Sequence, residues 1–133
     1  MVCKMLLFDF REEEKSFFKT YRNDNYDIKF IKEPLNVNTI KKLTSQELED
    51  TSIISVFITS EVSEEVILKF KNLRIISTRS ARYGHIDINS CVTNNIALVN
   101  VEDCAGKSVE YVLAETFKGI MSVYCGAKNY RVV

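Results

Sequence analysis

Short apolar segments rich in β-branched and aromatic residues alternate along the chain with segments of helical periodicity. The apolar segments occupy residues 4–9, 27–31, 52–59, 73–78 and 96–101. Between them, apolar residues recur at steps of three and four over residues 11–22, 37–49, 62–71 and, more briefly, 86–94. This alternation predicts successive βα units, whose strands form a parallel sheet. Because segments 52–59 and 73–78 are almost continuously apolar, we expect helices on both faces of that sheet.

A longer amphipathic helix is predicted over residues 107–125, just before Gly126. Its apolar face is expected to pack on the sheet through Val112, Phe117, Ile120 and Met121. Asp103 and Ser108 are both suitable residues for its N-terminal cap. Together these elements predict one flavodoxin-like α/β domain over residues 1–133, a three-layer sandwich around a five-stranded parallel sheet of order 2-1-3-4-5.

The composition narrows the range of partners. The chain carries 18 basic and 18 acidic side chains, so its formal net charge is zero, and no basic stripe suggests nucleic acid or a membrane surface as a partner. The apolar runs are too short to span a bilayer and the N-terminus lacks a signal-peptide pattern, so a cytoplasmic location is expected. Four widely spaced cysteines and a single histidine favour buried, reduced thiols over a metal site.

Ligands of such sheets lie beyond the carboxyl ends of the strands, where this chain offers little cofactor chemistry. After the first strand, DFREEEK brings three glutamates to the place where a flavodoxin would bind the phosphate of FMN. A receiver domain would need an aspartate after the third strand, but Thr59, Ser60 and Glu61 follow instead. Neither a GxGxxG nor a GxxxxGK[ST] sequence is present, so no nucleotide cofactor is expected.

His85 lies at the predicted junction between the fourth strand and its helix. As a general base it would need an orienting carboxylate, and Asp87 is the nearest candidate. A histidine at the start of a helix more often bonds to the local backbone, and we favour that interpretation.

Residues 76–88, ISTRSARYGHIDI, are followed by NSCVTNNIALVNVEDC. This stretch resembles the NAD-dependent D-2-hydroxyacid dehydrogenases, and among them the D-lactate dehydrogenases, which read ISTRSxGxDxID and then NVxxYxxxSVAE. FREEEKSFF, after the first strand, is similar to the acidic opening of the same enzymes. The resemblance covers residues 1–113, and residues 115–133 resemble the segment that returns to the substrate domain at the C-terminus of the family.

The resemblance implies a substrate domain without its coenzyme domain. Here SVEYVLA runs directly into ETFKGI, where the family inserts a Rossmann domain with the NAD fingerprint and the catalytic Arg, Glu and His. We therefore expect a truncated or engineered domain that is inactive alone and binds no cofactor. The alternatives are an enzyme that works with a separate coenzyme-binding chain, and a small flavodoxin-like binding or receiver-like module.

By the same resemblance, the loop that holds the substrate carboxylate falls on Ser80, Ala81, Arg82 and Tyr83. The family's glycine corresponds to Arg82, its aspartate to Gly84, and the aromatic residue of NVxxY to Cys104. Because a side chain in a left-handed turn costs about 1 kcal/mol, we expect the loop around Arg82 to have changed conformation. The resemblance thus implies a vestigial substrate site.

Loss of the coenzyme domain would also uncover apolar surface. We expect that surface around Tyr83, Cys104, Tyr111 and Leu113. Exposed apolar patches usually find a partner, and a two-fold pair is the commonest arrangement of identical chains. The sequence therefore predicts a weak homodimer at high concentration and a folded monomer when dilute.

Overall fold

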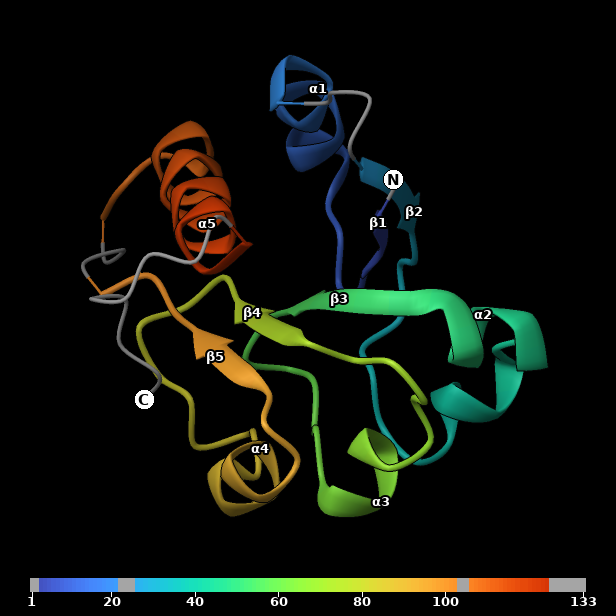
Figure 1. Cartoon of the computed structure of the whole chain (residues 1–133). Helices are drawn as coiled ribbons and strands as arrows, with labels where there is room; N and C mark the ends of the chain where they lie inside the picture. The colour runs from blue at the N-terminus through green and yellow to red at the C-terminus, as the bar shows by residue number, and fades with distance from the viewer. Residues whose placement is uncertain (1–2, 22–25, 103–105, 125–133) are drawn as a thin grey trace.

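The computed structural model describes residues 3–21, 26–102 and 106–124. Five parallel strands form one sheet: β1 (Cys3–Leu7), β2 (Tyr26–Phe30), β3 (Thr51–Val56), β4 (Ile75–Thr78) and β5 (Ala97–Val99). Their spatial order is β2-β1-β3-β4-β5, which confirms the predicted order 2-1-3-4-5 (Figure 1). Residues 53–56 of β3 pair in register with residues 75–78 of β4.

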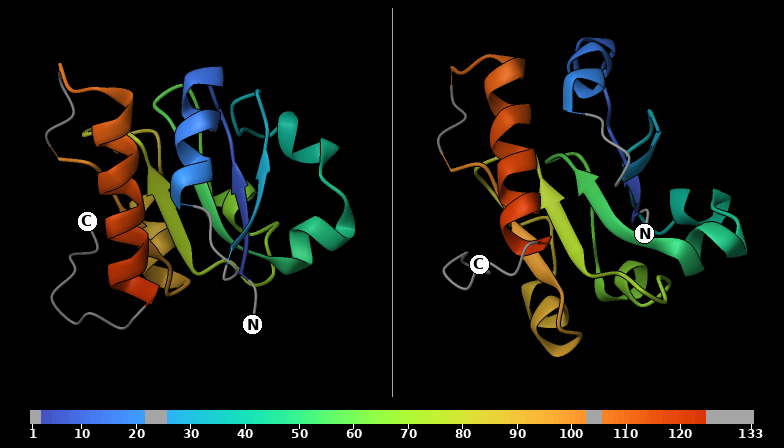
Figure 2. Two further views of the ribbon diagram at one scale, coloured as in Figure 1. Left: turned by 90° about the horizontal axis from the view of Figure 1, so that it is seen from above. Right: turned by 45° about the horizontal axis from the view of Figure 1, so that its top comes forward.

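Helices cover both faces of the sheet, as predicted. They are α1 (Glu12–Tyr21), the 3₁₀ helix η1 (Thr39–Lys42), α2 (Ser45–Asp50), α3 (Glu64–Ile67), α4 (Ile88–Thr93) and α5 (Val109–Tyr124). α1 and α5 lie side by side on one face, while η1, α2, α3 and α4 lie on the other (Figure 2). The molecule is therefore a three-layer α/β sandwich.

The central strands have no polar face because both faces are covered. In β3, Ile53 packs with the α1 and α5 side chains, and Ile54 packs with those of η1, α3 and α4. Both are 0% exposed. In β4, Ile75 and Ile76 divide in the same way between the two core clusters. Continuous apolar sequence in these strands thus reflects burial on both sides.

The single helix predicted over residues 37–49 is wrong, because Thr44 starts a new helix there. Its hydroxyl accepts a hydrogen bond from the Glu47 N–H, and the Glu47 carboxylate accepts one from the Thr44 N–H, both at 3.0 Å. This capping box separates η1 from α2. The helix predicted over residues 62–71 is also shorter, since Ser63 caps α3 and Leu68 follows its last residue.

α5 is one continuous helix of 16 residues, so the predicted continuity across Ala114 and Glu115 is confirmed. Ser108 accepts a hydrogen bond from the Tyr111 N–H at 3.1 Å and caps the helix, whereas Asp103 lies outside the described residues. The assignment of residues 115–133 to a returning segment stays a prediction. No helix in the described part of the chain combines the length and the apolarity needed to cross a membrane.

The packing of α5 on the sheet differs in part from the prediction. Phe117 and Ile120 are buried as predicted, but Met121 is 39% exposed. Leu113, which we expected on an exposed apolar surface, is 0% exposed and packs in the core between α5 and the sheet. That expectation was wrong because the inner face of α5 is centred on Leu113, Phe117 and Ile120, at steps of four and three.

Candidate functional site

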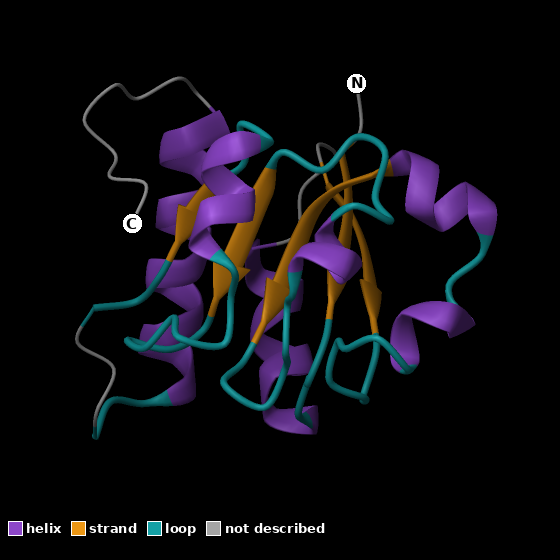
Figure 3. Cartoon of the chain, turned by 90° about the horizontal axis from the view of Figure 1, so that it is seen from below, coloured by secondary structure: helices purple, strands orange, loops and turns teal. Residues whose placement is uncertain are grey.

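The carboxyl ends of the five strands meet at one edge of the sheet, where the following loops gather (Figure 3). The β1–α1, β3–α3 and β4–α4 loops are joined there by hydrogen bonds rather than by apolar packing alone. For example, the Val62 N–H donates to the His85 carbonyl and the Asp87 N–H donates to the Val62 carbonyl. These contacts connect the loop after β3 with the loop after β4.

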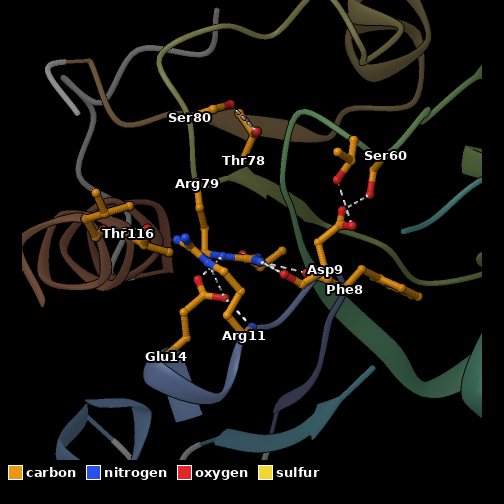
Figure 4. A network of polar contacts seen from close by, with 12 residues as sticks. Phe8, Asp9, Arg11, Glu14, Ser60, Thr78, Arg79, Ser80 and Thr116 are labelled. Atoms are coloured by element: carbon orange, nitrogen blue, oxygen red, sulfur yellow. Dashed lines mark hydrogen bonds and ion pairs between the residues drawn. The ribbon is translucent and has the colours of Figure 1, made fainter. Parts of the chain in front are cut away.

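Arg79, the first residue after β4, is the centre of a buried polar network (Figure 4). Its Nε donates to Glu14 Oε2 at 2.7 Å, and its Nη1 donates to Ser55 Oγ at 2.9 Å. Nη2 donates to the carbonyls of Phe8 and Asp9 at 2.7 and 3.2 Å. Burial lowers the pKa of Arg79, and the charge of Glu14 opposes that effect. The guanidinium therefore ties β4 to β3, to α1 and to the loop after β1.

Asp9, held by Arg79 through its carbonyl, has a left-handed backbone with φ of 58°. Its carboxylate accepts hydrogen bonds from Thr59 Oγ1 at 2.7 Å and from Ser60 Oγ at 2.6 Å. A left-handed aspartate is uncommon and persists where neighbours fix it. Two hydroxyl donors from the β3–α3 loop and one guanidinium fix it here.

Beyond Arg79, three consecutive peptide carbonyls are turned toward the protein. The Ser80 carbonyl accepts from the Val101 N–H at 3.1 Å, and the Ala81 carbonyl accepts from Asn100 Nδ2 at 3.1 Å. The Arg82 carbonyl accepts from Ser80 Oγ at 2.7 Å. Asn100 and Val101, which follow β5, and Ser80 of the loop itself thus hold the backbone of this segment.

This arrangement determines where the amide N–H groups of the loop point. In a trans peptide the C=O and the following N–H point in opposite directions, and no described peptide is cis. The N–H groups of Ala81, Arg82 and Tyr83 are therefore directed away from the groups that hold the preceding carbonyls. No acceptor among the described residues receives a hydrogen bond from them. Successive free backbone N–H groups are suited to an anion.

The conformation of the loop explains how Arg82 can stand where the family has a glycine. Only Asp9, Asn95 and Gly106 have positive φ in the described chain, so Arg82 is not in the left-handed region. Gly84 does not occupy that region either, and a Cβ on it would meet no atom within 4 Å. The structure thus holds an ordinary backbone at both positions.

Thr78, Ser80 and His85 form a short hydrogen-bonded chain beneath the loop. Ser80 uses its one hydroxyl proton on the Arg82 carbonyl, so it accepts from Thr78 Oγ1 at 2.7 Å. Thr78 in turn accepts from His85 Nε2 at 2.9 Å, which assigns the Nε2–H tautomer. Burial lowers the pKa of His85, with the charge of Asp9 opposing it, so the ring is neutral at neutral pH.

The predicted partners of His85 were wrong. Asp87 accepts instead from the Ser90 N–H at 3.0 Å as the N-cap of α4. The ring of His85 bonds to a side chain of β4 rather than to the local backbone, because the loop folds back over Thr78. His85 thus lacks the orienting carboxylate that a general base would need.

The structure brings together four of the five predicted site residues. Ser80, Ala81, Arg82 and Tyr83 form the loop, and Ala81, Arg82 and Tyr83 line an open groove of about 800 Å³ with the start of α4. Ser80 is buried and Arg82 is exposed. Cys104, the fifth, lies outside the described residues.

The residues after β1 do not fit the diphosphate of NAD. α1 carries Glu12, Glu13 and Glu14 in its first turn, where a phosphate-binding helix would present free N–H groups and no negative charge. Glu14 Oε1 already accepts from the Arg11 N–H at 2.8 Å. Among the described residues, no group of three or more His, Cys, Asp or Glu is placed to hold a metal ion. Cys3 and Cys91 are both buried, as predicted.

Three contributors to the site were not identified from the sequence: Glu14, Arg79 and Asn100. Arg79 directly follows a strand that is buried along its whole length, and a buried cation there needs a carboxylate. Glu14 lies four residues before the buried Phe18 on the same face of α1, so helical periodicity alone assigns it to the inner face. For Asn100, the sequence offers no comparable signal apart from its place in the NVxxY motif.

The fold and the loop define a flavodoxin-like α/β domain whose candidate ligand site lies at the carboxyl ends of the strands. The sequence profile of the D-isomer specific 2-hydroxyacid dehydrogenase catalytic domain matches residues 5–112. The chain therefore belongs to this family, which confirms the resemblance in its sequence and argues against a receiver-like module. Among curated proteins, none matches the chain.

Solved structures share the fold of this chain. A D-lactate dehydrogenase from Aquifex aeolicus, complexed with NAD and lactic acid, is 25% identical with a TM-score of 0.64, over 89% of this chain and 33% of that chain. D-lactate dehydrogenases from Escherichia coli (14% identity, TM-score 0.65, 95% and 41%) and Treponema pallidum (19%, 0.64, 96% and 40%) share the fold. The chain thus spans between 33% and 41% of these three chains.

Proposed function

We propose that this chain is the substrate domain of a D-2-hydroxyacid dehydrogenase and binds the carboxylate of a 2-hydroxyacid or 2-oxoacid through the N–H groups of Ala81, Arg82 and Tyr83. One observation carries the proposal: three consecutive carbonyls are engaged by the protein, and the three following N–H groups have no acceptor among the described residues. A carboxylate is a strong acceptor for such donors. Family membership supports this class of ligand.

We further propose that the chain alone transfers no hydride. The reaction needs a bound nicotinamide and an acid–base group beside the carbonyl. The first turn of α1 is acidic, and the neutral His85 is engaged with Thr78. The chain therefore supplies the substrate half of a site and leaves the coenzyme half to another domain.

The carboxylate site is tested by titrating the isotope-labelled chain with pyruvate and following backbone amide signals by NMR. We expect the signals of residues 81–83 to shift in a saturable way. Asn100→Ala removes the hydrogen bond that holds the Ala81 carbonyl and should weaken binding by about 2- to 10-fold, the equivalent of one hydrogen bond. Asn72→Ala is the matched control, because Asn72 makes a similar bond to the Glu49 carbonyl at the opposite edge of the sheet. Pyruvate that shifts no loop amide contradicts the proposal.

The absence of hydride transfer is tested by NADH oxidation with pyruvate at high concentrations of the chain. No turnover is expected. Turnover that His85→Ala abolishes would show that the chain carries its own acid–base group and coenzyme site.

A further inference from the structure

We propose that Arg82 selects ligands with a second carboxylate, so that the preferred ligand is a dicarboxylic 2-oxoacid or 2-hydroxyacid. This inference rests on the proposed function, since the first carboxylate would be held by the N–H groups of residues 81–83. Arg82 would then bind the carboxylate at the other end of the ligand.

The charges around the loop single out Arg82. The guanidinium of Arg79 is neutralised by Glu14 and lies beneath the loop, 2% exposed. His85 is neutral, because burial lowers its pKa. Arg82, in contrast, is exposed and forms no ion pair with any acidic residue of the described chain. It is thus the cation of the loop that remains available to a ligand.

The groove beside the loop leaves space for such a ligand. Arg82 lines it together with Gly84 and the first residues of α4, including Asp87. Gly84 has no side chain to fill the groove, and even a Cβ there would meet nothing within 4 Å. Asp87 is the one acidic residue lining the groove, and its carboxylate is engaged by the Ser90 N–H. It is beyond ion-pair distance of Arg82, so it does not cancel the cation by direct contact.

Arginine suits this role because its planar guanidinium can donate two parallel hydrogen bonds to one carboxylate. A monocarboxylic acid would use only the loop N–H groups, whereas a dicarboxylic acid would use both sets of donors. The exposed position of Arg82 limits the gain, since water screens the interaction. We expect a preference of about 10-fold for the dicarboxylic ligand.

The test compares 2-oxoglutarate with 2-oxopentanoate, two five-carbon 2-oxoacids that differ in the second carboxylate. Affinities are measured from the loop amide signals by NMR titration. The native chain should bind 2-oxoglutarate about 10-fold more tightly than 2-oxopentanoate, and Arg82→Met should bind the two ligands with equal affinity. Arg74→Met, an exposed arginine at the opposite end of β4, is the matched control and should keep the preference.

The outcomes separate this inference from the proposed function. Equal affinities for the two ligands in the native chain overturn the selection by a second carboxylate but leave the carboxylate loop intact. A preference that survives Arg82→Met assigns the selection to another residue and overturns the role of Arg82. If neither ligand shifts the loop amides, the proposed function itself fails, and this inference fails with it.

Discussion

Replacing Arg79 by methionine should destabilise the domain strongly, because it removes one member of a buried ion pair. Glu14 and Arg79 are 3% and 2% exposed, and their side chains meet at 2.7 Å. The substitution leaves the Glu14 carboxylate buried without its cation and leaves Ser55 and two backbone carbonyls without their donor. Breaking a buried pair on one side costs about 3–5 kcal/mol. That is a large part of the total stability of a typical domain, about 5–15 kcal/mol.

The double variant Arg79→Met/Glu14→Gln separates the lost pair from the uncompensated charge. Glutamine keeps the oxygen that accepts from the Arg11 N–H and removes the negative charge. We therefore expect the double variant to be more stable than Arg79→Met alone, and we expect a coupling free energy of about 0.5–3 kcal/mol between the two sites. Replacement of both members of a buried pair is often nearly neutral, which is the physical reason for this expectation.

Urea unfolding followed by far-ultraviolet circular dichroism measures these differences as changes in the midpoint at constant slope. Arg82→Met is the control for loss of an arginine at an exposed site and should change the free energy of unfolding by no more than about 0.5 kcal/mol. A loss below about 1 kcal/mol for Arg79→Met would show that Arg79 is not an essential structural centre. A double variant as unstable as the sum of the two single variants would contradict the coupling.

Four further predictions concern single positions. Phe117→Ala should cost about 3–5 kcal/mol in urea unfolding, because Phe117 is 5% exposed and contacts the ring of Phe18; a loss below about 1 kcal/mol would contradict its burial. Gly84→Ala should raise the stability by about 0.4–1 kcal/mol, since nothing opposes a Cβ there; a loss would indicate a strained backbone. Because burial lowers the pKa of His85, stability should fall as the pH drops below about 6.5, and this part of the pH dependence should be absent in His85→Gln. The homodimer stays a prediction: sedimentation at high concentration should show weak pairing that Tyr111→Glu reduces, and a strict monomer would contradict it.

The strand order could be predicted from the sequence because it follows from local patterns. Strand-like apolar segments alternate with segments of helical periodicity, and a doubly wound sheet connects them in few ways. The helix boundaries could not be predicted as well, because a single side chain decides them. Thr44 and Glu47 stop one helix and start the next within a segment whose apolar periodicity continues.

The loop could be located from its likeness to a family, but the contacts that hold its backbone could not be predicted. The hydrogen bond from Asn100 to the Ala81 carbonyl joins residues that are 19 positions apart, and the ion pair of Arg79 joins residues that are 65 positions apart. Pairs so far apart in the sequence do not follow from local periodicity. Our expectation that Leu113 lies on an exposed surface failed for a related reason, since the inner face of α5 depends on how the helix is rotated against the sheet.

A long cation at the tip of the loop becomes understandable once the backbone is considered first. Hydrogen bonds from Val101, Asn100 and Ser80 hold three successive carbonyls, so the direction of the loop N–H groups does not depend on a glycine at position 82. The side chain at that position is therefore free to vary without redirecting these N–H groups. Arginine at such a position adds a second donor group beside the first. The scaffold thus separates two tasks: the backbone would bind the carboxylate common to all 2-hydroxyacids, and residue 82 would distinguish among them.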